Sequence, residues 1–364
     1  MAVRIDLGHM KLALKLAMKA KDKTYPNPMV GALITRGGKV IGKGYHKKAG
    51  SAHAEIKAIA SVVGSCRGAE MYVTLEPCNH YGKTPPCTEA IIASGISQVY
   101  VAMKDPNPVC AGKGIIRLRK AGIRVNIGLC ENEARELNRK YIKFITTSLP
   151  YVTIKLAESL DGKIAARDGS SKWISSEISR KFVRKIRAEF DAILVGSNTV
   201  RADNPFLLDE KKKGYDTARL VVDSRLKISL SSNLIKTAER SSVIIGTTEL
   251  AEKRKIEKLR KVRGVRIIVT KSKKGKVALK AFLKQLYKLG IVNILVEGGG
   301  RIAGGLIDES LADEVMFFIS PKIIGGDGYS SVAGFGAKSV GAATPVINIK
   351  VRRMGEDIFV RGYL

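Results

Sequence analysis

The sequence of 364 residues is short of cysteine, aromatic residues and acidic residues. Its five cysteines are an odd number, which argues against a disulfide framework and for a reducing compartment. Aromatic residues make up 6% and form no RNA-binding motif, which argues against a dedicated nucleic-acid platform. No apolar run is long enough to span a bilayer, and the N-terminus lacks the order of a signal peptide. We therefore expect a cytoplasmic protein that does not bind membranes.

The shortage of acidic residues leaves a formal net charge of +31. The excess is spread over both halves of the chain, so it does not predict a specific nucleic-acid partner, although it would draw phosphorylated anions toward the protein. The densest basic run, residues 253–261, is interrupted by Ile256 and Leu259. This spacing is typical of a solvated helix face, and we assign it no function.

The chain is long enough for two domains, and the hydrophobic pattern predicts that both are α/β. A polar turn ending at Pro150 favours domains at 1–147 and 148–364. Strand-like and helical runs alternate in the first domain, which predicts three layers. Its strands are expected at 30–34, 40–42, 71–75 and 99–102. Those of the second are expected at 152–156, 192–196, 220–223, 242–246, 267–270, 294–297 and 315–319, followed by an antiparallel pair at 346–351 and 358–363.

The most informative motif contains His53, Glu55, Cys78 and Cys87. One imidazole and two thiolates are three of the four ligands of tetrahedral zinc, and the open fourth position suits a catalytic water. A carboxylate two residues from the histidine can carry protons between that water and a leaving amine. His-x-Glu followed by Pro-Cys and a second cysteine is the signature of zinc deaminases.

Two other interpretations of this motif stay open: a structural zinc site that recruits His80, and cysteines that are merely buried. The local context argues against both. Cys87 follows two prolines and precedes an apolar run, so it is expected in the first turn of a helix, and residues 51–55 open a second helical run. A helix N-terminus favours the thiolate form of a cysteine that it carries.

In the second domain, a glycine-rich turn at 297–301 lies between a predicted strand and a helix. Backbone amides there could approach a phosphate, although a tight strand-to-helix corner explains the glycines equally well. Polar residues at 155–163 and 171–175 surround the only tryptophan, Trp173, which favours its being a wall of a site.

Together these segments resemble one family, the bifunctional riboflavin-biosynthesis enzymes, in which a pyrimidine deaminase is fused to a pyrimidine reductase. The resemblance covers nearly the whole chain. In the first half it rests on residues 26–31, 44–46, 53–55, 74–78, 82–87 and 105–108. In the second half it rests on residues 159–162, 173–174, 187–188, 191–196, 199–200, 203–205 and 297–299.

The resemblance implies a cytidine-deaminase-like domain followed by a dihydrofolate-reductase-like domain. The first would use one zinc ion to deaminate a diamino-ribosylamino-pyrimidinone phosphate, with Glu55 as the proton carrier and His53, Cys78 and Cys87 as metal ligands. The second would use NADPH to reduce the ribosyl group to ribityl, by orienting cofactor and substrate rather than by covalent catalysis. A homo-oligomer is the expected state, although the sequence does not fix the number of subunits.

Further site residues are implied by position in the family's motifs. For the deaminase they are the substrate contacts Asn27, His46, Lys83, Asp105 and Asn107. Of these, Asn27 and Asp105 could equally serve turns beside proline, and His46 could equally be a surface residue. For the reductase the substrate contacts are Lys155, Ser171, Arg187, Leu207 and Glu297. Its cofactor contacts are Ala157, Trp173, Ser175, Thr199, Asp203, Ser224, Gly299, Gly300 and Arg301.

One residue departs from the family pattern. Glu210 stands where the family usually has an arginine that contacts the substrate phosphate, although Lys211, Lys212, Lys213 or Arg187 could compensate. This departure motivates a second hypothesis, a deaminase whose reductase-like domain no longer turns over. A third hypothesis is a basic nucleic-acid-editing deaminase, which would leave the second domain without a role.

Overall fold

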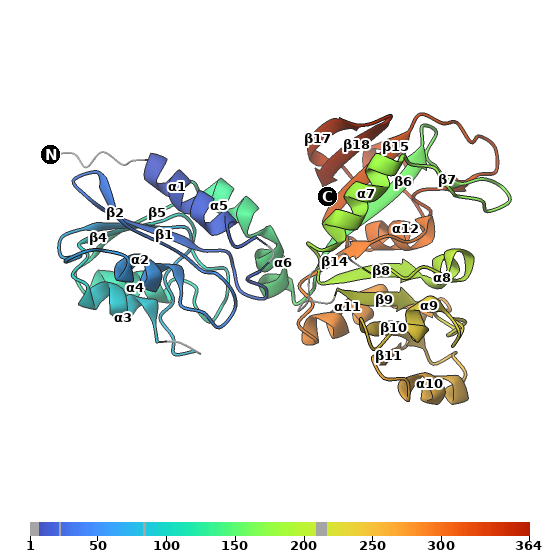
Figure 1. Cartoon of the computed structure of the whole chain (residues 1–364), viewed down its shortest axis with the longest axis horizontal. Helices are drawn as coiled ribbons and strands as arrows, with labels where there is room; N and C mark the ends of the chain where they lie inside the picture. The colour runs from blue at the N-terminus through green and yellow to red at the C-terminus, as the bar shows by residue number, and fades with distance from the viewer. Residues whose placement is uncertain (1–6, 22, 83–84, 209–216) are drawn as a thin grey trace. The chain divides into compact units, whose positions relative to one another are not determined.

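A computed structural model describes residues 7–21, 23–82, 85–208 and 217–364 of the chain (Figure 1). The chain divides into two compact units, Met1–Ser148 and Leu149–Leu364. Both units alternate strands and helices, so the prediction of an α/β protein is confirmed. Among the described residues, no helix is long and apolar enough to cross a membrane.

The first unit contains a five-stranded sheet and helices on both of its faces (Figure 1). The predicted hairpin is β1 and β2, which pair antiparallel, and β4 and β5 continue the sheet in parallel from β3. Its elements are α1 (Leu7–Met18), β1 (Gly31–Arg36), β2 (Lys39–Tyr45), α2 (Ala54–Ala60), β3 (Glu70–Val73), α3 (Cys87–Ala93), β4 (Gln98–Val101), α4 (Lys113–Lys120), β5 (Arg124–Ile127), α5 (Glu131–Leu137) and α6 (Arg139–Thr147).

Each face of this sheet has its own hydrophobic core. One core joins α2, α3 and α4 to the sheet through residues such as Ala58, Ile91 and Leu118. The other joins α1 and α5 to the opposite face through Met10 and Ala134. This is the three-layer arrangement predicted from the alternating pattern, and it places the N-terminal ends of α2 and α3 where their side chains can meet.

The second unit contains a nine-stranded mixed sheet in the order β11-β10-β9-β8-β14-β6-β15-β18-β17. The strands from β11 to β15 pair in parallel, and the last two are antiparallel, as predicted for the C-terminal pair. The sheet strands are β6 (Tyr151–Ser159), β8 (Ala192–Gly196), β9 (Ala218–Val222), β10 (Val243–Thr248), β11 (Val265–Thr270), β14 (Asn293–Val296), β15 (Glu314–Ser320), β17 (Ile347–Met354) and β18 (Asp357–Tyr363).

Helices and short strands surround this sheet. They are β7 (Lys163–Ala165), α7 (Glu177–Arg187), α8 (Ser197–Asp203), α9 (Asn233–Lys236), α10 (Lys253–Arg260), β12 (Ser272–Lys273), β13 (Lys276–Val277), α11 (Leu279–Lys288), α12 (Gly300–Asp308), β16 (Tyr329–Ser330) and a 3-10 turn (Val340–Ala342). α11 and α12 pack on one face, and α9 and α10 pack on the other. Ile256 and Leu259 are the buried side of α10, which confirms that the basic run 253–261 is a solvated helix face.

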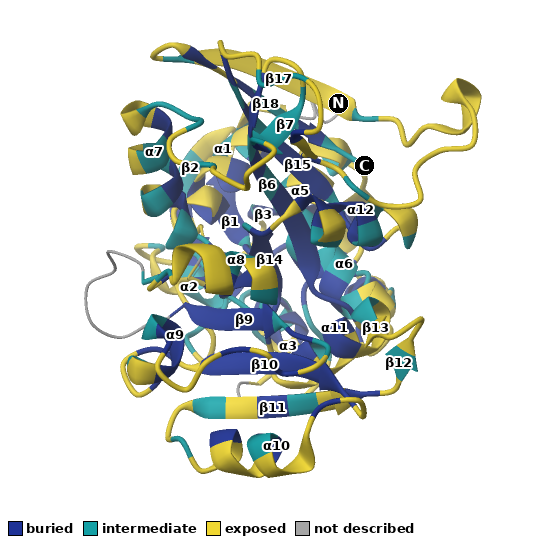
Figure 2. Ribbon diagram, turned by 90° about the vertical axis from the view of Figure 1, so that its right-hand side faces the viewer, coloured by how far each residue is buried: buried dark blue, intermediate teal, exposed yellow. Residues whose placement is uncertain are grey.

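Burial follows the parallel topology of the second sheet (Figure 2). Every residue of β10 and β14 is buried because helices cover both faces of the parallel region. The edge strand β17 is exposed along nearly its whole length. Most of the residues implied for the reductase lie at strand ends or in the connections that follow them, whereas Lys155 and Ala157 lie within β6.

Candidate active sites

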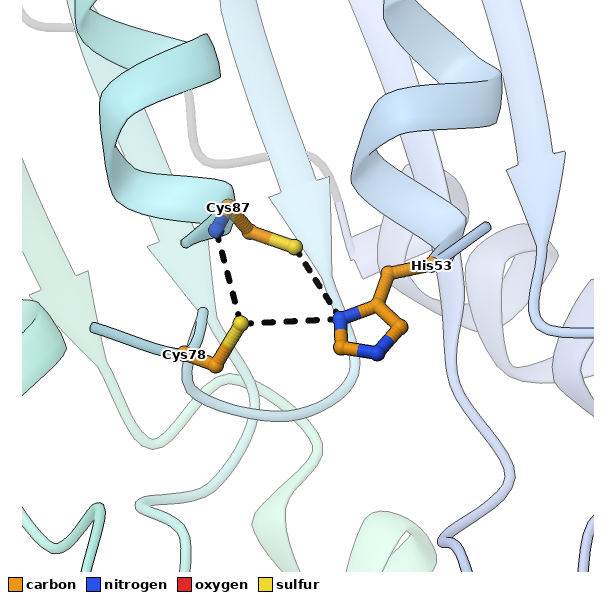
Figure 3. A group of neighbouring side chains, drawn as sticks. All are labelled: His53, Cys78 and Cys87. Atoms are coloured by element: carbon orange, nitrogen blue, oxygen red, sulfur yellow. Dashed lines mark hydrogen bonds between the residues drawn. The ribbon is translucent and has the colours of Figure 1, made fainter. Parts of the chain in front are cut away.

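The metal motif is assembled by two helix starts and one loop of the first unit (Figure 3). His53 immediately precedes α2, Cys87 is the first residue of α3, and Cys78 lies in the loop after β3. The predicted positions of both helices are confirmed. Their convergence brings together three side chains that lie up to 34 residues apart in the sequence.

The donor atoms fit a single tetrahedral cation. His53 Nδ1 lies 3.2 Å from Cys87 Sγ and 3.5 Å from Cys78 Sγ, and all three atoms lie within 4.8 Å of one another. Around tetrahedral zinc with ordinary bond lengths, nitrogen and sulfur ligands are separated by about 3.5 Å. The Cys87 amide also donates to Cys78 Sγ at 3.4 Å, which orients that sulfur.

Two titratable groups at this site are strongly perturbed. Hydrogen bonds from Cys87 and His53 lower the pKa of the Cys78 thiol to about 4, so this sulfur is a ready anionic ligand. Glu55 is only 3% exposed in the first turn of α2, and burial raises the pKa of its carboxyl to about 7. A carboxyl with a pKa near neutrality can both accept and return a proton, which is what a deamination requires.

Two of the expected substrate contacts lie beside the metal ligands. The His46 ring is 5.3 Å from the His53 ring at nearly a right angle, and His46 Nε2 is 3.1 Å from Asn27 Nδ2. The other nitrogen of His46 lies 3.4 Å from the Ala52 carbonyl oxygen. Asn27 therefore does more than serve a turn, because its side chain reaches a histidine 19 residues away.

Asp105 and Asn107, two further expected substrate contacts, lie in the loop after β4. The Asn107 amide donates to Asp105 Oδ1 at 2.9 Å, and the Val109 amide donates to Asn107 Oδ1 at 3.0 Å, so both side chains do serve turns. Asp105 is nevertheless buried, at 7% exposed, and also accepts from Tyr141. A carboxylate that only closes a surface turn would not need a buried partner from another helix.

Sequence reasoning missed one buried residue, Glu76, which holds the Asp105 loop in place. The Glu76 carboxylate accepts hydrogen bonds from the amides of Asp105, Gly112, Gly114 and Ile115 at 2.9 to 3.2 Å. Glu76 thereby ties the loop of Cys78 to the start of α4 and to the Asp105 loop. Its place in the quoted segment 74–78 was the only available signal, since its partners are backbone groups that carry no sequence pattern.

In the second unit, the implied substrate contacts Lys155, Arg187 and Glu297 come from three elements. Arg187 ends α7 and forms a bidentate ion pair with Glu297 after β14, at 2.6 and 2.9 Å. The pair is largely buried, with side chains 17% and 8% exposed. Burial lowers the pKa of Lys155 in β6, while Glu297 opposes that shift. The three charges together suit a phosphorylated ligand with hydroxyl groups.

The implied cofactor contacts follow the ends of several strands. Ala157 lies in β6, Thr199 and Asp203 lie in α8, and Ser224 follows β9. Ser224 Oγ accepts from the Val277 amide at 3.1 Å, which fixes its orientation.

Trp173 is 62% exposed, which supports a wall rather than a core role. The Arg180 guanidinium lies 4.4 Å from its ring centroid, and Lys322 Nζ donates to its carbonyl at 2.7 Å. Arg180 also donates to the Ser175 carbonyl, whereas Ser171 lies in the loop before Trp173.

The glycine-rich turn has features of a phosphate cradle. Gly299 has a φ of 26°, and a Cβ at Gly300 would collide with backbone oxygens of residues 330 and 331. Gly300 and Arg301 begin α12, the first amides of a helix lack intrahelical partners, and Arg301 is exposed. The residues present therefore fit a dinucleotide that carries phosphate groups, and they also form the tight corner considered above.

Of three remaining residues, Leu207 lies in the core, and Lys83 and Glu210 are not among those that the structure describes. Leu207 is buried, with a φ of 51°, and packs in the core with Val200 and Leu226, so the structure shows it as a packing residue.

Comparison with family models assigns both units. Residues 4–103 match the cytidine and deoxycytidylate deaminase zinc-binding region. Residues 150–360 match the RibD C-terminal domain.

Similar proteins cover almost the whole chain. The riboflavin biosynthesis protein RibD of Aquifex aeolicus is 45% identical over 98% of both chains, and that of Escherichia coli is 37% identical over 97% of this chain and 98% of its own. Among solved structures, Acinetobacter baumannii RibD has a TM-score of 0.85 at 34% identity and covers 98% of both chains. The Thermotoga maritima diaminohydroxyphosphoribosylaminopyrimidine deaminase/5-amino-6-(5-phosphoribosylamino)uracil reductase has a TM-score of 0.82, with the same identity and coverage.

Proposed function

The chain belongs to the RibD family of riboflavin biosynthesis proteins, and from this premise we propose how its residues divide two reactions. Membership confirms the predicted cytidine-deaminase-like and dihydrofolate-reductase-like domains. It also confirms a bifunctional enzyme that is a zinc-dependent deaminase and an NADPH-dependent reductase. A nucleic-acid-editing deaminase leaves the second unit unexplained and is not favoured.

For the deaminase, we propose His53, Cys78 and Cys87 as the zinc ligands and Glu55 as the proton carrier. When bound by these three residues, zinc would supply a water of lowered pKa. Glu55 would accept a proton from that water and deliver it to the departing amine. Asn27, His46, Asp105 and Asn107, with Lys83, are proposed to hold the substrate 2,5-diamino-6-ribosylamino-4-pyrimidinone 5'-phosphate.

For the reductase, NADPH supplies the hydride that converts the ribosyl group to ribityl. Lys155, Ser171, Arg187 and Glu297 are proposed to hold the pyrimidine product of the first reaction. Leu207, which is buried in the core, is also proposed to contact that substrate. The cofactor is assigned to Ala157, Trp173, Ser175, Thr199, Asp203, Ser224, Gly299, Gly300 and Arg301.

One observation carries the proposal: the His53, Cys78 and Cys87 donor atoms meet around a single point with Glu55 buried beside them. The test is an assay of the purified protein with the diamino-pyrimidine phosphate, following ammonia release and NADPH oxidation separately. Ammonia release without NADPH, and NADPH oxidation only after deamination, are expected. Ammonia release that requires NADPH would overturn the assignment of two separate sites.

We further propose domain limits of 1–147 and 148–364, one residue from the division between the compact units. Each unit has its own sheet and its own hydrophobic cores. A fragment ending near Ser148 should therefore fold, bind zinc and release ammonia without NADPH. A fragment that is inactive although folded and loaded with zinc would contradict these limits.

We also propose that the protein is a cytoplasmic homo-oligomer without a nucleic-acid partner. A homo-oligomer is supported by β17, the sheet edge on which Ile347, Ile349 and Val351 are each more than half exposed. Light scattering should give a mass above 39.5 kDa for the wild type, and Ile349→Lys with Val351→Lys should lower it toward that value. An unchanged mass would exclude this edge as the interface.

Five free thiols are consistent with the reducing cytoplasm, and the dispersed charge favours no nucleic-acid partner.

A further inference from the structure

Helix α6 carries a buried tyrosine that reaches the Asp105 loop of the deaminase site. Tyr141 is 6% exposed, and its hydroxyl donates to Asp105 Oδ1 at 2.9 Å. The two residues are 36 positions apart, so the contact is a product of the fold rather than of a local turn. Nothing in the sequence motifs singles out Tyr141, because its neighbours 139–147 form an ordinary amphipathic helix.

Two further hydrogen bonds hold Asp105, one at its carboxylate and one at its backbone amide. The Asn107 amide donates to Asp105 Oδ1 at 2.9 Å, and the Asp105 amide donates to Glu76 Oε2 at 3.2 Å. The first bond restrains the carboxylate from its own loop, and the second fixes the backbone. The Tyr141 hydroxyl donates to the same carboxylate oxygen from helix α6, so it ties the orientation of the carboxylate to an element outside that loop.

Helix α6 is itself anchored near the second substrate loop. Asn138, directly before α6, accepts from the Met29 amide at 2.8 Å and donates to the Met29 carbonyl at 3.0 Å. Met29 lies two residues after Asn27. The start of α6 is thus fixed relative to one substrate loop, and Tyr141, one turn later, reaches the other.

We propose that Tyr141 is a positioning residue for the deaminase: its hydroxyl orients the Asp105 carboxylate toward the amino and hydroxyl donors of the substrate. This inference rests on the proposed function, which assigns Asp105 to the substrate. A carboxylate with one fixed oxygen presents the other in a defined direction, so a donor group on the substrate meets an acceptor that is already aligned.

The charges around Asp105 make its hydrogen bonds consequential. Burial raises the pKa of the Asp105 carboxyl, whereas hydrogen bonds from the Asn107 amide, the Tyr141 hydroxyl and the Cys110 thiol lower it, and Glu76 raises it slightly. Burial raises the pKa of Tyr141, so the hydroxyl remains a donor. Removing the Tyr141 hydroxyl should therefore raise the pKa of the Asp105 carboxyl, so that Asp105 gains its proton at a higher pH.

The test is Tyr141→Phe in the full-length zinc enzyme, which removes one oxygen and keeps the buried ring. Deaminase KM should rise about three- to tenfold, the effect expected from one hydrogen bond, while kcat and zinc content stay unchanged. The acid limb of the kcat/KM profile should move to higher pH because Asp105 would gain its proton more readily. Tyr100→Phe is the matched control, since Tyr100 is a buried tyrosine in β4 stacked 4.5 Å from Tyr72.

Asp105→Asn separates this inference from the assignment on which it rests. If Tyr141 acts through Asp105, adding Tyr141→Phe to Asp105→Asn should produce no further rise in KM. If Asp105→Asn raises KM but Tyr141→Phe behaves like Tyr100→Phe, the positioning role is overturned and the substrate role of Asp105 stands. If neither Asp105→Asn nor Tyr141→Phe changes KM, the assignment of Asp105 to the substrate fails, and the positioning role fails with it.

Discussion

The two sites of this chain are built in opposite ways. The deaminase site gathers its ligands from one segment of 35 residues, His53 to Cys87, and holds them with buried side chains. The residues proposed for the reductase lie in or after β6, β8, β9 and β14, and several of them, including Trp173, Asp203 and Arg301, are exposed. The first has its reacting groups within the protein, whereas the second leaves much of its surface to be covered by ligands.

This difference follows from the chemistry. Proton transfer and water activation depend on a few groups whose spacing and pKa values must be set before the substrate arrives. Hydride transfer needs no protein nucleophile, so a broad surface that orients two large ligands is sufficient. Single substitutions should therefore have drastic effects in the first site and graded effects in the second.

The largest expected effect is that of Glu55→Gln. Loss of the proton carrier should reduce deamination by about a hundred- to ten-thousandfold, with one zinc ion per chain retained and reductase activity unchanged. Ammonia release, metal content and NADPH oxidation check the three parts. Glu89→Gln is a matched control on α3, where the exposed Glu89 pairs with Arg117. If zinc were lost with the carboxylate, Glu55 would be a ligand.

A smaller effect is expected from Glu297→Gln in the reductase. Arg187 would keep its charge in a largely buried position without its partner, so kcat/KM for reduction should fall roughly ten- to a hundredfold. Deamination should stay constant. Glu309→Gln, which removes the surface ion pair with Lys273, provides the comparison. If the Glu297→Gln variant kept wild-type reductase activity, the buried ion pair would not belong to the substrate site.

Glu210→Arg should have a more modest effect and in the favourable direction. Restoring the family's usual cation should lower the reductase KM by about tenfold if no neighbouring lysine already contacts the phosphate. If Lys211, Lys212 and Lys213 fill the role, this change should matter little, and neutralising them should raise KM instead. Insensitivity to both changes would show that this segment does not contact the phosphate. A reductase that is inactive both before and after Glu210→Arg would support the hypothesis of an impaired domain.

The smallest effect concerns acid stability of the second unit. Burial opposes ionisation of Glu297, but Arg187 lies beside it and holds the pKa of Glu297 below its usual value of 4.5. The stabilising contribution is therefore complete above about pH 4.5 and is lost as the pH falls through the lower folded value. Thermal melts of the C-terminal fragment should show this decline for the wild type and a flatter profile for Glu297→Gln. Parallel profiles would show that the pair does not couple to folding.

The sequence predicted the first site better than the second for a physical reason. His53, Glu55, Cys78 and Cys87 are the residue types that zinc-dependent deamination needs, at a fixed spacing. Strand-like and helical runs also alternate clearly in the sequence around them. Glu76 and Tyr141 escaped prediction because their partners are backbone amides and a distant carboxylate. Leu207 packs in the core, and the substrate contact implied by its place in the family motif stays a prediction. The strand β5 and helices α5 and α6 were not predicted, since such short segments gain stability only by packing on the completed sheet.

The position of α6 in the chain bears on how the protein is made. Residues 138 and 141, which grip the loops of Met29 and Asp105, are among the last of the first unit to leave the ribosome. His53, Cys78 and Cys87 are therefore synthesised before the residues that connect α6 to these two loops. A nascent chain that ends before α6 lacks both contacts, so the two loops gain them only as synthesis reaches the second unit.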